Sequence, residues 1–203
     1  MATKTRTSKR TSSKRTVTKE DLMTYYMNEV LENEQPPTSI YKFCKQLTIT
    51  EEKFYSHFGS FEVLQKHIWL AFFDQAIGVI NKSKEYDSFG KREKLLTFYF
   101  TIFEVLTLNR SYILLSLKNP LDIAQLSLLR SAFQEYILDL SKMETENKNF
   151  KQKYSAKAIK ELGWSQFLVI LRFWIKDGSR GFEKTDVMIE KTINTTFDVV
   201  DTT

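Results

Sequence analysis

The stretch SIYKFCKQLTITEEKFYSHFGSFEVLQKHI, residues 39–68, carries the most regular local pattern in the chain. Ile40, Phe43 and Leu47 recur at the spacing of a single apolar helix face. A second group, Phe54 and Phe58, has the same helical spacing after a short interruption. The stretch therefore predicts two short amphipathic helices separated by a brief break.

Polar residues and one glycine mark where these helices begin and end. Thr50 is suited to cap the second short helix, and Gly59 is suited to end it. Ser60 then opens a long helix, and the break between the two short helices falls at Thr48–Ile49. A helix, a short break, a second helix and a long connecting helix form a helix-turn-helix arrangement.

The rest of the chain has few residues that interrupt helices. The 203 residues contain 6 Gly and 3 Pro, while 42% are hydrophobic. Strands and their turns normally need more breakers than this, so the composition favours an all-α fold of about nine helices. Apolar periodicity predicts the other helices at residues 18–32, 60–83, 91–109, 112–118, 121–143, 151–176 and 183–200.

Positive charge is concentrated at the beginning of the sequence. Residues 1–19 contain seven basic residues and no acidic one, whereas the remainder has 23 basic and 25 acidic residues. Ser and Thr fill the gaps, so residues 1–17 are expected to form a disordered basic arm. Such an arm suits DNA phosphates, and the alternative is a solubilising tail without a partner. The basic residues of the arm that we expect at DNA are Lys4, Arg6, Lys9, Arg10, Lys14 and Arg15.

Residues 39–68 resemble the DNA-binding segment of the tetracycline-repressor (TetR) family. Tyr55-Ser56-His57-Phe58 matches the family's Tyr-x-x-Phe pair, and Ile49 and Leu64 match its buried aliphatic positions. The resemblance implies a helix-turn-helix domain at residues 18–66 and a helical ligand-binding and dimerisation domain at residues 67–203. It further implies double-stranded DNA as a partner. The domain residues that we expect at DNA are Tyr41, Lys42, Lys53, Tyr55, Ser56 and His57.

Several positions depart from the family pattern. Thr48 stands where the family usually has Gly, and Phe61 stands where it often has a phosphate-binding Lys. Residues 20–67 hold eight acids against four lysines, although a surface that meets phosphates should be positive. Two alternatives therefore remain beside DNA binding. One is a lipid-binding accessory protein that shares the fold without binding DNA, and the other is a protein–protein scaffold.

The last two helices carry apolar stripes that favour a homodimer. The family resemblance implies that these helices pair with their copies in a four-helix bundle, and a two-fold dimer also spaces two recognition helices for two half-sites. The alternative is that the stripes pack inside one protomer. The predicted interface residues are Leu162, Gln166, Val169, Phe173, Ile193, Phe197 and Val200.

Aromatic side chains are dense in the central helices, and together they indicate a pocket for a large apolar molecule or lipid. Each of them taken singly is more often plain core. Tyr99, Tyr136, Gln134 or Arg130 are the candidates to hold the ligand's polar end. The predicted ligand-binding residues are Phe98, Tyr99, Phe103, Arg130, Phe133, Tyr136, Phe167 and Trp174.

The chain lacks the residue patterns that catalysis and metal binding require. His57 and His67 are its two histidines, and their spacing suits no metal site. Cys44 is expected to be inert core, and there is no Gly-rich phosphate loop. We expect no enzyme activity, metal or cofactor. A single cysteine, no apolar signal region and no long apolar run predict a cytoplasmic protein without a membrane span.

Overall fold

The computed structural model describes residues 17–117, 122–142 and 155–201, and in these ranges the chain is helical without a strand. The expected all-α fold is therefore confirmed. The α-helices of these ranges are α1 (Lys19–Asn33), α2 (Ile40–Gln46), α3 (Glu51–Tyr55), α4 (Phe61–Ile80), α5 (Lys91–Leu108), α6 (Arg110–Ser116), α7 (Ser127–Lys142), α9 (Ala156–Lys176) and α10 (Glu183–Asp201). Short 3-10 helices occur at η1 (Tyr86–Ser88), η2 (Asp122–Leu126) and η3 (Arg180–Phe182).

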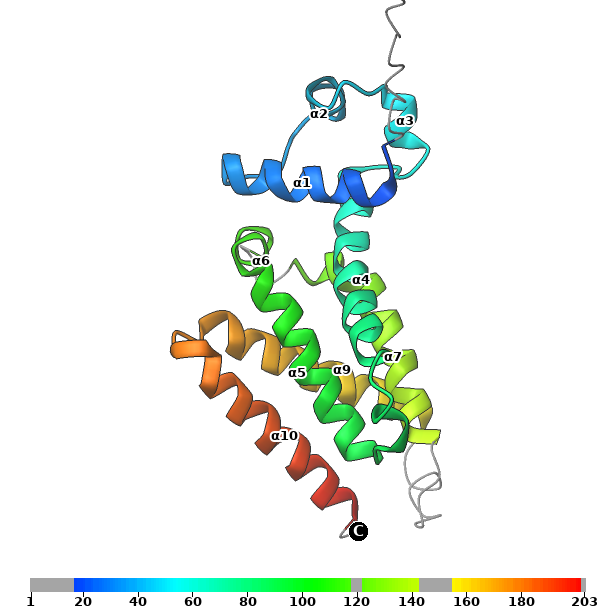
Figure 1. The fold of residues 1–203 in the computed structure, drawn as a ribbon, viewed down its shortest axis with the longest axis vertical. Helices are drawn as coiled ribbons and strands as arrows, with labels where there is room; N and C mark the ends of the chain where they lie inside the picture. Colours follow the sequence, from blue (N-terminus) through cyan, green and yellow to red (C-terminus); the bar gives the residue numbers. More distant parts are fainter. Residues whose placement is uncertain (1–16, 118–121, 143–154, 202–203) are drawn as a thin grey trace, which may run out of the picture.

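Helices α1, α2 and α3 form a small unit at one end of an elongated molecule, and α4 runs from this unit into the larger bundle (Figure 1). α1 packs on α4 and α6, while α4 packs on α5 and α7 in the bundle. α10 lies on the side of the bundle opposite α4 and α7, where it packs against α5 and α9. The predicted domain boundary at residues 66–67 falls inside α4, so this one helix belongs to both parts.

Side-chain hydroxyls cap the N-terminal ends of α1, α2 and α3. Thr18 accepts from the Asp21 backbone N–H, and the Asp21 carboxylate accepts from the Thr18 N–H, which makes a capping box. Ser39 and Thr50 accept from the N–H groups three residues on. These local bonds satisfy backbone donors that a short helix would otherwise leave exposed.

The predicted helix boundaries need correction at three places. The helix expected at residues 60–83 ends at Ile80, and the one expected from residue 112 begins at Arg110. The helix expected at residues 121–143 begins as the 3-10 turn η2 and becomes α-helical only at Ser127. Sequence periodicity does not distinguish a short 3-10 turn from the first turn of an α-helix, because i and i+3 neighbours share one face in both geometries.

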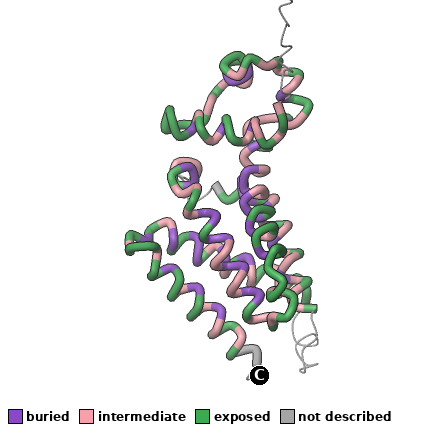
Figure 2. Tube along the Cα trace, in the orientation of Figure 1, coloured by how far each residue is buried: buried purple, intermediate pink, exposed green. Residues whose placement is uncertain are grey.

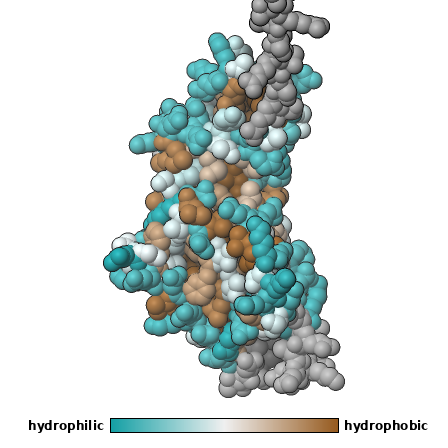
Figure 3. Space-filling model, in the orientation of Figure 1, coloured by the Kyte–Doolittle hydropathy of each residue, from teal (hydrophilic) through white to brown (hydrophobic). Residues whose placement is uncertain are grey.

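Buried positions line the inner faces of the helices and run without interruption from the small unit into the bundle (Figure 2). On the face shown in Figure 3, apolar residues are exposed among polar ones along the middle of the molecule. In the described ranges, no helix combines the length and the apolar content that crossing a bilayer demands.

Candidate functional site

The helix-turn-helix unit is held by a compact group of aromatic rings. Phe43 on α2 meets Phe54 on α3 edge-on at a centroid distance of 6.0 Å, and Phe61 lies 5.4 Å from Phe43. Tyr26 of α1 closes the group, 5.4 Å from Phe61. Phe61, which stands where the family often has a lysine, is half-buried and packs against the core, where it links α2 and α3 to α1. Cys44 is also buried, and burial raises the pKa of its thiol.

The turn between α2 and α3 contains a strained residue. Thr48 has a φ of 54°, in the left-handed region that a β-branched side chain rarely adopts. Its amide still donates to the Lys45 carbonyl over 3.2 Å, and Ile49 donates to the Cys44 carbonyl over 3.0 Å. Thr48 therefore adopts a left-handed backbone conformation that its β-branched side chain disfavours.

Replacing Thr48 by Gly is expected to stabilise the protein. The left-handed conformation costs a residue with a Cβ about 1–2 kcal/mol, while glycine loses roughly 0.5–1 kcal/mol more chain entropy on folding. A net gain of about 0.5–1 kcal/mol should appear as a higher urea midpoint. Lys45→Gly is the matched control, because Lys45 is exposed on helical backbone and this change should destabilise. A lower midpoint for Thr48→Gly would contradict the strain argument.

Most of the predicted DNA-contacting side chains of the domain lie on its surface. Tyr41 on α2 is 59% exposed and Tyr55 on α3 is 51% exposed, so both phenols are open to a partner. Lys42 and Ser56 are also exposed, and Lys53 is half-buried. The predicted arm residues, Lys4, Arg6, Lys9, Arg10, Lys14 and Arg15, lie outside the described residues.

His57 is placed differently from its neighbours. Its Nε2 is buried and has no hydrogen-bond partner among the described residues. The ring lies 6.5 Å from Phe58 in a tilted arrangement. This nitrogen therefore faces the protein and reaches a phosphate only if the side chain changes rotamer.

Lys19 and His67 tie the start of α1 to α4, a contact that the sequence reasoning missed. The Lys19 Nζ lies 3.0 Å from the His67 Nδ1 and 5.6 Å from the centroid of the Phe58 ring. Burial and the neighbouring Lys19 charge lower the pKa of His67, so the ring is neutral near pH 7 and accepts the hydrogen bond. This contact holds the start of α1 against α4.

The predicted ligand-binding aromatics pack against one another in the bundle. Phe133 lies 5.5 Å from Phe98 and 5.3 Å from Phe167, and Phe103 lies 6.0 Å from Trp174. All of them are buried. Tyr99 is buried with its hydroxyl unpartnered in the described structure, and burial raises its pKa.

The predicted polar residues of the ligand site already have protein partners. The Tyr136 hydroxyl lies 2.7 Å from the Tyr86 hydroxyl and donates to the Lys94 carbonyl over 3.3 Å. Arg130 forms a surface ion pair with Glu161 at 2.7 Å. Of these two residues, Tyr136 contacts the aromatic cluster, 4.6 Å from Phe98. Two other predicted ligand residues, Phe103 and Trp174, line a small pocket of about 220 Å³ beside the turn that joins α9 to α10.

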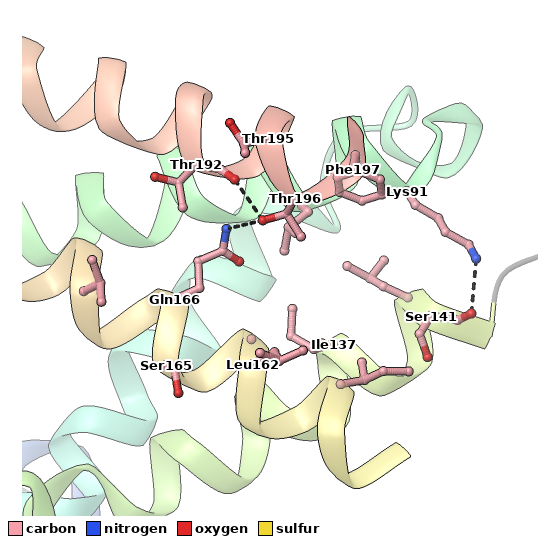
Figure 4. Close-up of a pocket in the computed structure, with 15 residues that line it drawn as sticks. Lys91, Ile137, Ser141, Leu162, Ser165, Gln166, Thr192, Thr195, Thr196 and Phe197 are labelled. Atoms are coloured by element: carbon pink, nitrogen blue, oxygen red, sulfur yellow. Dashed lines mark hydrogen bonds between the residues drawn. The ribbon is translucent and has the colours of Figure 1, made fainter. Parts of the chain in front are cut away.

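The larger open space lies elsewhere, in a groove of about 560 Å³ between the N-terminal end of α5, the C-terminal end of α7, and α9 and α10 (Figure 4). The sequence reasoning did not find it, although threonines at i, i+3 and i+4 on α10 were a visible signal. The groove is lined by Lys91, Leu95, Ile137, Leu140, Ser141, Ile159, Leu162, Gly163, Ser165, Gln166, Val169, Thr192, Thr195, Thr196 and Phe197.

The predicted dimer residues divide into two groups. Leu162, Val169 and Phe173 of α9 are 63%, 54% and 38% exposed, and Gln166 lies between them, half-buried. Phe197 is half-buried, and Ile193 is fully buried inside its own protomer. Val200 lies in α10, but its side chain is outside the described part. The exposed members of the set therefore come from α9.

Within the described ranges, no three His, Cys, Asp or Glu side chains gather as metal ligands do.

Residues 94–203 match a family model described as "Tetracyclin repressor-like, C-terminal domain". The chain belongs to the TetR family. No curated protein was found that matches it. The match covers the bundle from Lys94 of α5 onwards, where the sequence resemblance was weakest, and it supports a regulator of the TetR family.

In this TetR-family bundle, Arg110 links α6 to the end of α9. Its guanidinium donates to the carbonyls of Trp174 over 2.9 Å and of Ile175 over 3.0 Å. It also lies over the rings of Trp174 and Phe182, at 4.5 and 4.6 Å. Since α6 packs on α1, Arg110 connects the last two helices to the helix-turn-helix unit through one short helix.

Asp177 organises the turn from α9 into α10. One of its carboxylate oxygens accepts from the Ser179 N–H and hydroxyl, and the other accepts from the Thr185 N–H and hydroxyl. Burial alone would raise the pKa of Asp177, but the hydrogen bonds from Thr185 and Ser179 outweigh it and hold the pKa well below its usual range.

Asp177→Asn is expected to lower stability at neutral pH. A depressed carboxylate pKa contributes stability that is complete above the unfolded-state value, about 3.9, and is lost as the pH falls towards the folded-state value. The urea midpoints of wild type and variant should therefore differ at pH 7 and converge below about pH 4.

Asp186→Asn is a matched control with the opposite sign. Burial and the charges of Glu190, Asp177 and Glu183 raise the pKa of Asp186, so its ionised form is unfavourable. Neutralising it should stabilise the protein slightly at pH 7. Parallel pH profiles for wild type and Asp177→Asn would contradict the role given to Asp177.

Proposed function

We propose that this protein is a cytoplasmic transcriptional regulator that binds double-stranded DNA as a homodimer and responds to an apolar ligand. The observation that supports DNA binding most directly is the exposed face of α2 and α3. Family membership supports the same assignment. On this face Tyr41 and Tyr55 stand open to solvent, on helices fixed by the aromatic group beneath them.

The chemistry of this face suits positioning on a DNA backbone. Tyrosine and serine hydroxyls donate to phosphate oxygens, and Lys42 and Lys53 bring positive charge. Glu52 is exposed and Glu51 half-buried at the start of α3, and both oppose approach to phosphates. The basic arm would supply the positive charge that the domain lacks, along the backbone or in a minor groove.

The homodimer would place two such faces on neighbouring half-sites. Leu162, Val169 and Phe173 form an exposed stripe on α9, at spacings of seven and four residues. Exposed apolar stripes of this kind gain by burial against a second copy, and two-fold pairing is the commonest solution. A regulated response would then pass from the bundle to the DNA-binding unit through α4 and α6.

A second candidate function is a lipid-binding protein that no longer binds DNA. The acidic residues at the start of α3 and the apolar groove between α9 and α10 favour it. In that case the helix-turn-helix unit serves only to complete the fold. Binding of random-sequence DNA separates the two candidates.

The experiment is a salt titration of the full-length protein with fluorescein-labelled random duplex DNA, followed by anisotropy. We expect log affinity to fall linearly with log salt. Lys53→Gln should reduce the slope by about 0.9, because one phosphate contact is lost. Lys191→Gln, an exposed lysine on α10, should leave the slope unchanged. Absence of binding at low salt would reject the regulator, and a lipid extracted from the same protein would then support the second candidate.

A further inference from the structure

The small pocket beside the turn from α9 to α10 lies at one edge of the bundle (Figure 1). Its volume of about 220 Å³ is below the range of about 300–1,000 Å³ that drug-sized ligands occupy. It therefore suits a small ligand or a head group. None of its residues belongs to the predicted dimer interface, whereas four residues of that interface line the larger groove.

Three aromatic rings line the pocket. Phe103 and Trp174 are buried, with their ring centroids 6.0 Å apart, and the half-buried Phe182 lies 6.1 Å from Trp174. The Trp174 Nε1 donates to the Thr107 hydroxyl over 3.2 Å, so the polar edge of the indole is already bonded within the protein. The faces of aromatic rings attract cations. This part of the lining therefore favours a cation or a neutral apolar group over an anion.

Two carboxylates line the same pocket. Glu104 comes from α5 and Asp186 from α10, and both are exposed. Within the described part of the chain, neither carboxylate has an ion pair or a side-chain hydrogen bond. Partial desolvation and the charges of Glu190, Asp177 and Glu183 raise the pKa of Asp186. The pocket thus carries negative charge on the two helices that face each other across it.

The basic side chains near the pocket do not cancel this charge. Arg110 lies over two of the rings but does not line the pocket, and its guanidinium donates to three carbonyls around the end of α9. The Asp177 carboxylate is the charge that acts on Arg110. Arg180 and Lys184 are exposed on either side of the turn, and neither lines the pocket. The two lining carboxylates therefore remain available to a ligand.

We infer that this pocket binds a small organic cation with a methylated ammonium group, which lies against the three rings and faces Glu104 and Asp186. Aromatic rings combined with negative charge are the surroundings that methylated ammonium groups favour in proteins. A calcium ion would need about six to eight oxygen ligands, more than two carboxylates offer, and an anion would be repelled. The inference goes beyond the proposed function and does not depend on it, because binding is measured without DNA.

The test titrates the full-length protein with choline and with 3,3-dimethylbutan-1-ol, the neutral isostere in which carbon replaces the ammonium nitrogen. The readout is the indole N–H signals of the three tryptophans in NMR spectra, assigned by single Trp→Phe variants. Trp174 lines the pocket, whereas Trp69 and Trp164 do not, so the Trp174 signal alone should move. We expect choline to bind about five- to tenfold more tightly than the isostere.

Three variants test the lining. Glu104→Gln combined with Asp186→Asn removes both charges at nearly constant size, and it should weaken choline binding about five- to tenfold while changing isostere binding less than about twofold. Glu32→Gln combined with Asp74→Asn is the matched control, because it removes two exposed charges on α1 and α4 outside the pocket and should change neither. Phe182→Leu keeps an apolar side chain but removes one ring, so it should weaken choline binding more than isostere binding.

Four outcomes overturn the inference. Equal affinity for choline and the isostere would show that the pocket recognises shape and not charge. Full choline affinity after loss of Glu104 and Asp186 would show that these carboxylates do not hold the cation. Movement of the Trp69 or Trp164 signal instead would place the ligand elsewhere. No movement of any indole signal at choline concentrations up to tens of millimolar would show that the pocket does not bind it. DNA binding, measured on the same variants without choline, reports on the proposed function separately.

Discussion

Removal of residues 1–16 is expected to lower affinity for duplex DNA by about 100- to 1,000-fold at low salt. The segment carries six basic residues and no acidic one, so its loss changes the formal net charge from +5 to −1. The remaining DNA-facing unit is acidic, and Glu51 and Glu52 stand at the start of α3. Without the arm, approach to phosphates would be opposed by the domain's own charge.

The deletion ends at residue 16 because the next residues belong to the fold. Val17 packs on the core, Thr18 caps α1, and Lys19 bonds to His67. A truncation that begins later would confuse lost charge with lost stability. The fall in the slope of log affinity against log salt counts the lost phosphate contacts, and it should reach up to about 5.

Two full-length controls separate charge from chain length. Substituting Gln at all six basic positions should reproduce the deletion. Shuffling the order of residues 2–16 should retain the non-specific affinity, because that affinity depends on charge and not on sequence. If DNA binding survives both the deletion and the neutralisation, its affinity comes from α2 and α3, and the arm is a solubilising tail.

The small unit was predictable because its structure is set by near neighbours in the sequence. The caps at Thr18, Ser39 and Thr50 lie within three residues of the donors they satisfy. The apolar spacing of Phe43, Phe54 and Phe58 then decides which faces turn inward. Even the anomaly at Thr48 was visible, since the resemblance placed a glycine there.

The bundle was less predictable because its geometry depends on residues far apart in the chain. Arg110 bonds to carbonyls more than sixty positions away, and nothing in its neighbourhood marks it for that role. Aromatic density pointed to a pocket, but rings that fit together fill space as readily as they enclose it. The open space lies between α5, α7, α9 and α10, and the relative placement of four helices is not encoded in the sequence of any one of them.

Leu162→Asp and Phe173→Asp are each expected to convert the dimer to monomer. The two positions lie about 16 Å apart along α9, at 1.5 Å per residue. A carboxylate buried without a partner costs several kcal/mol, and about 3 kcal/mol corresponds to a weakening of the dimer by roughly 100-fold. Sedimentation at several protein concentrations measures this change directly.

The choice of positions keeps dimerisation apart from folding, and Phe173 also keeps it apart from ligand binding. Leu162 is 63% exposed, so an aspartate there is tolerated in the protomer, but Leu162 lines the groove, whereas Phe173 does not. Leu108, at the end of α5 and 75% exposed, provides the control, because Leu108→Asp makes the same change outside the α9 stripe. A dimer of native size in both α9 variants would mean that the stripe is not the interface.

The same variants connect assembly to DNA binding. If the two protomers of a dimer bind two neighbouring half-sites, binding of the first protomer raises the effective concentration of the second at its own half-site. Monomeric Leu162→Asp should then lose affinity for DNA while it keeps the salt dependence of a single unit. Unchanged affinity in a proven monomer would show that each copy binds alone, and the α9 stripe would then serve a purpose other than spacing two recognition helices.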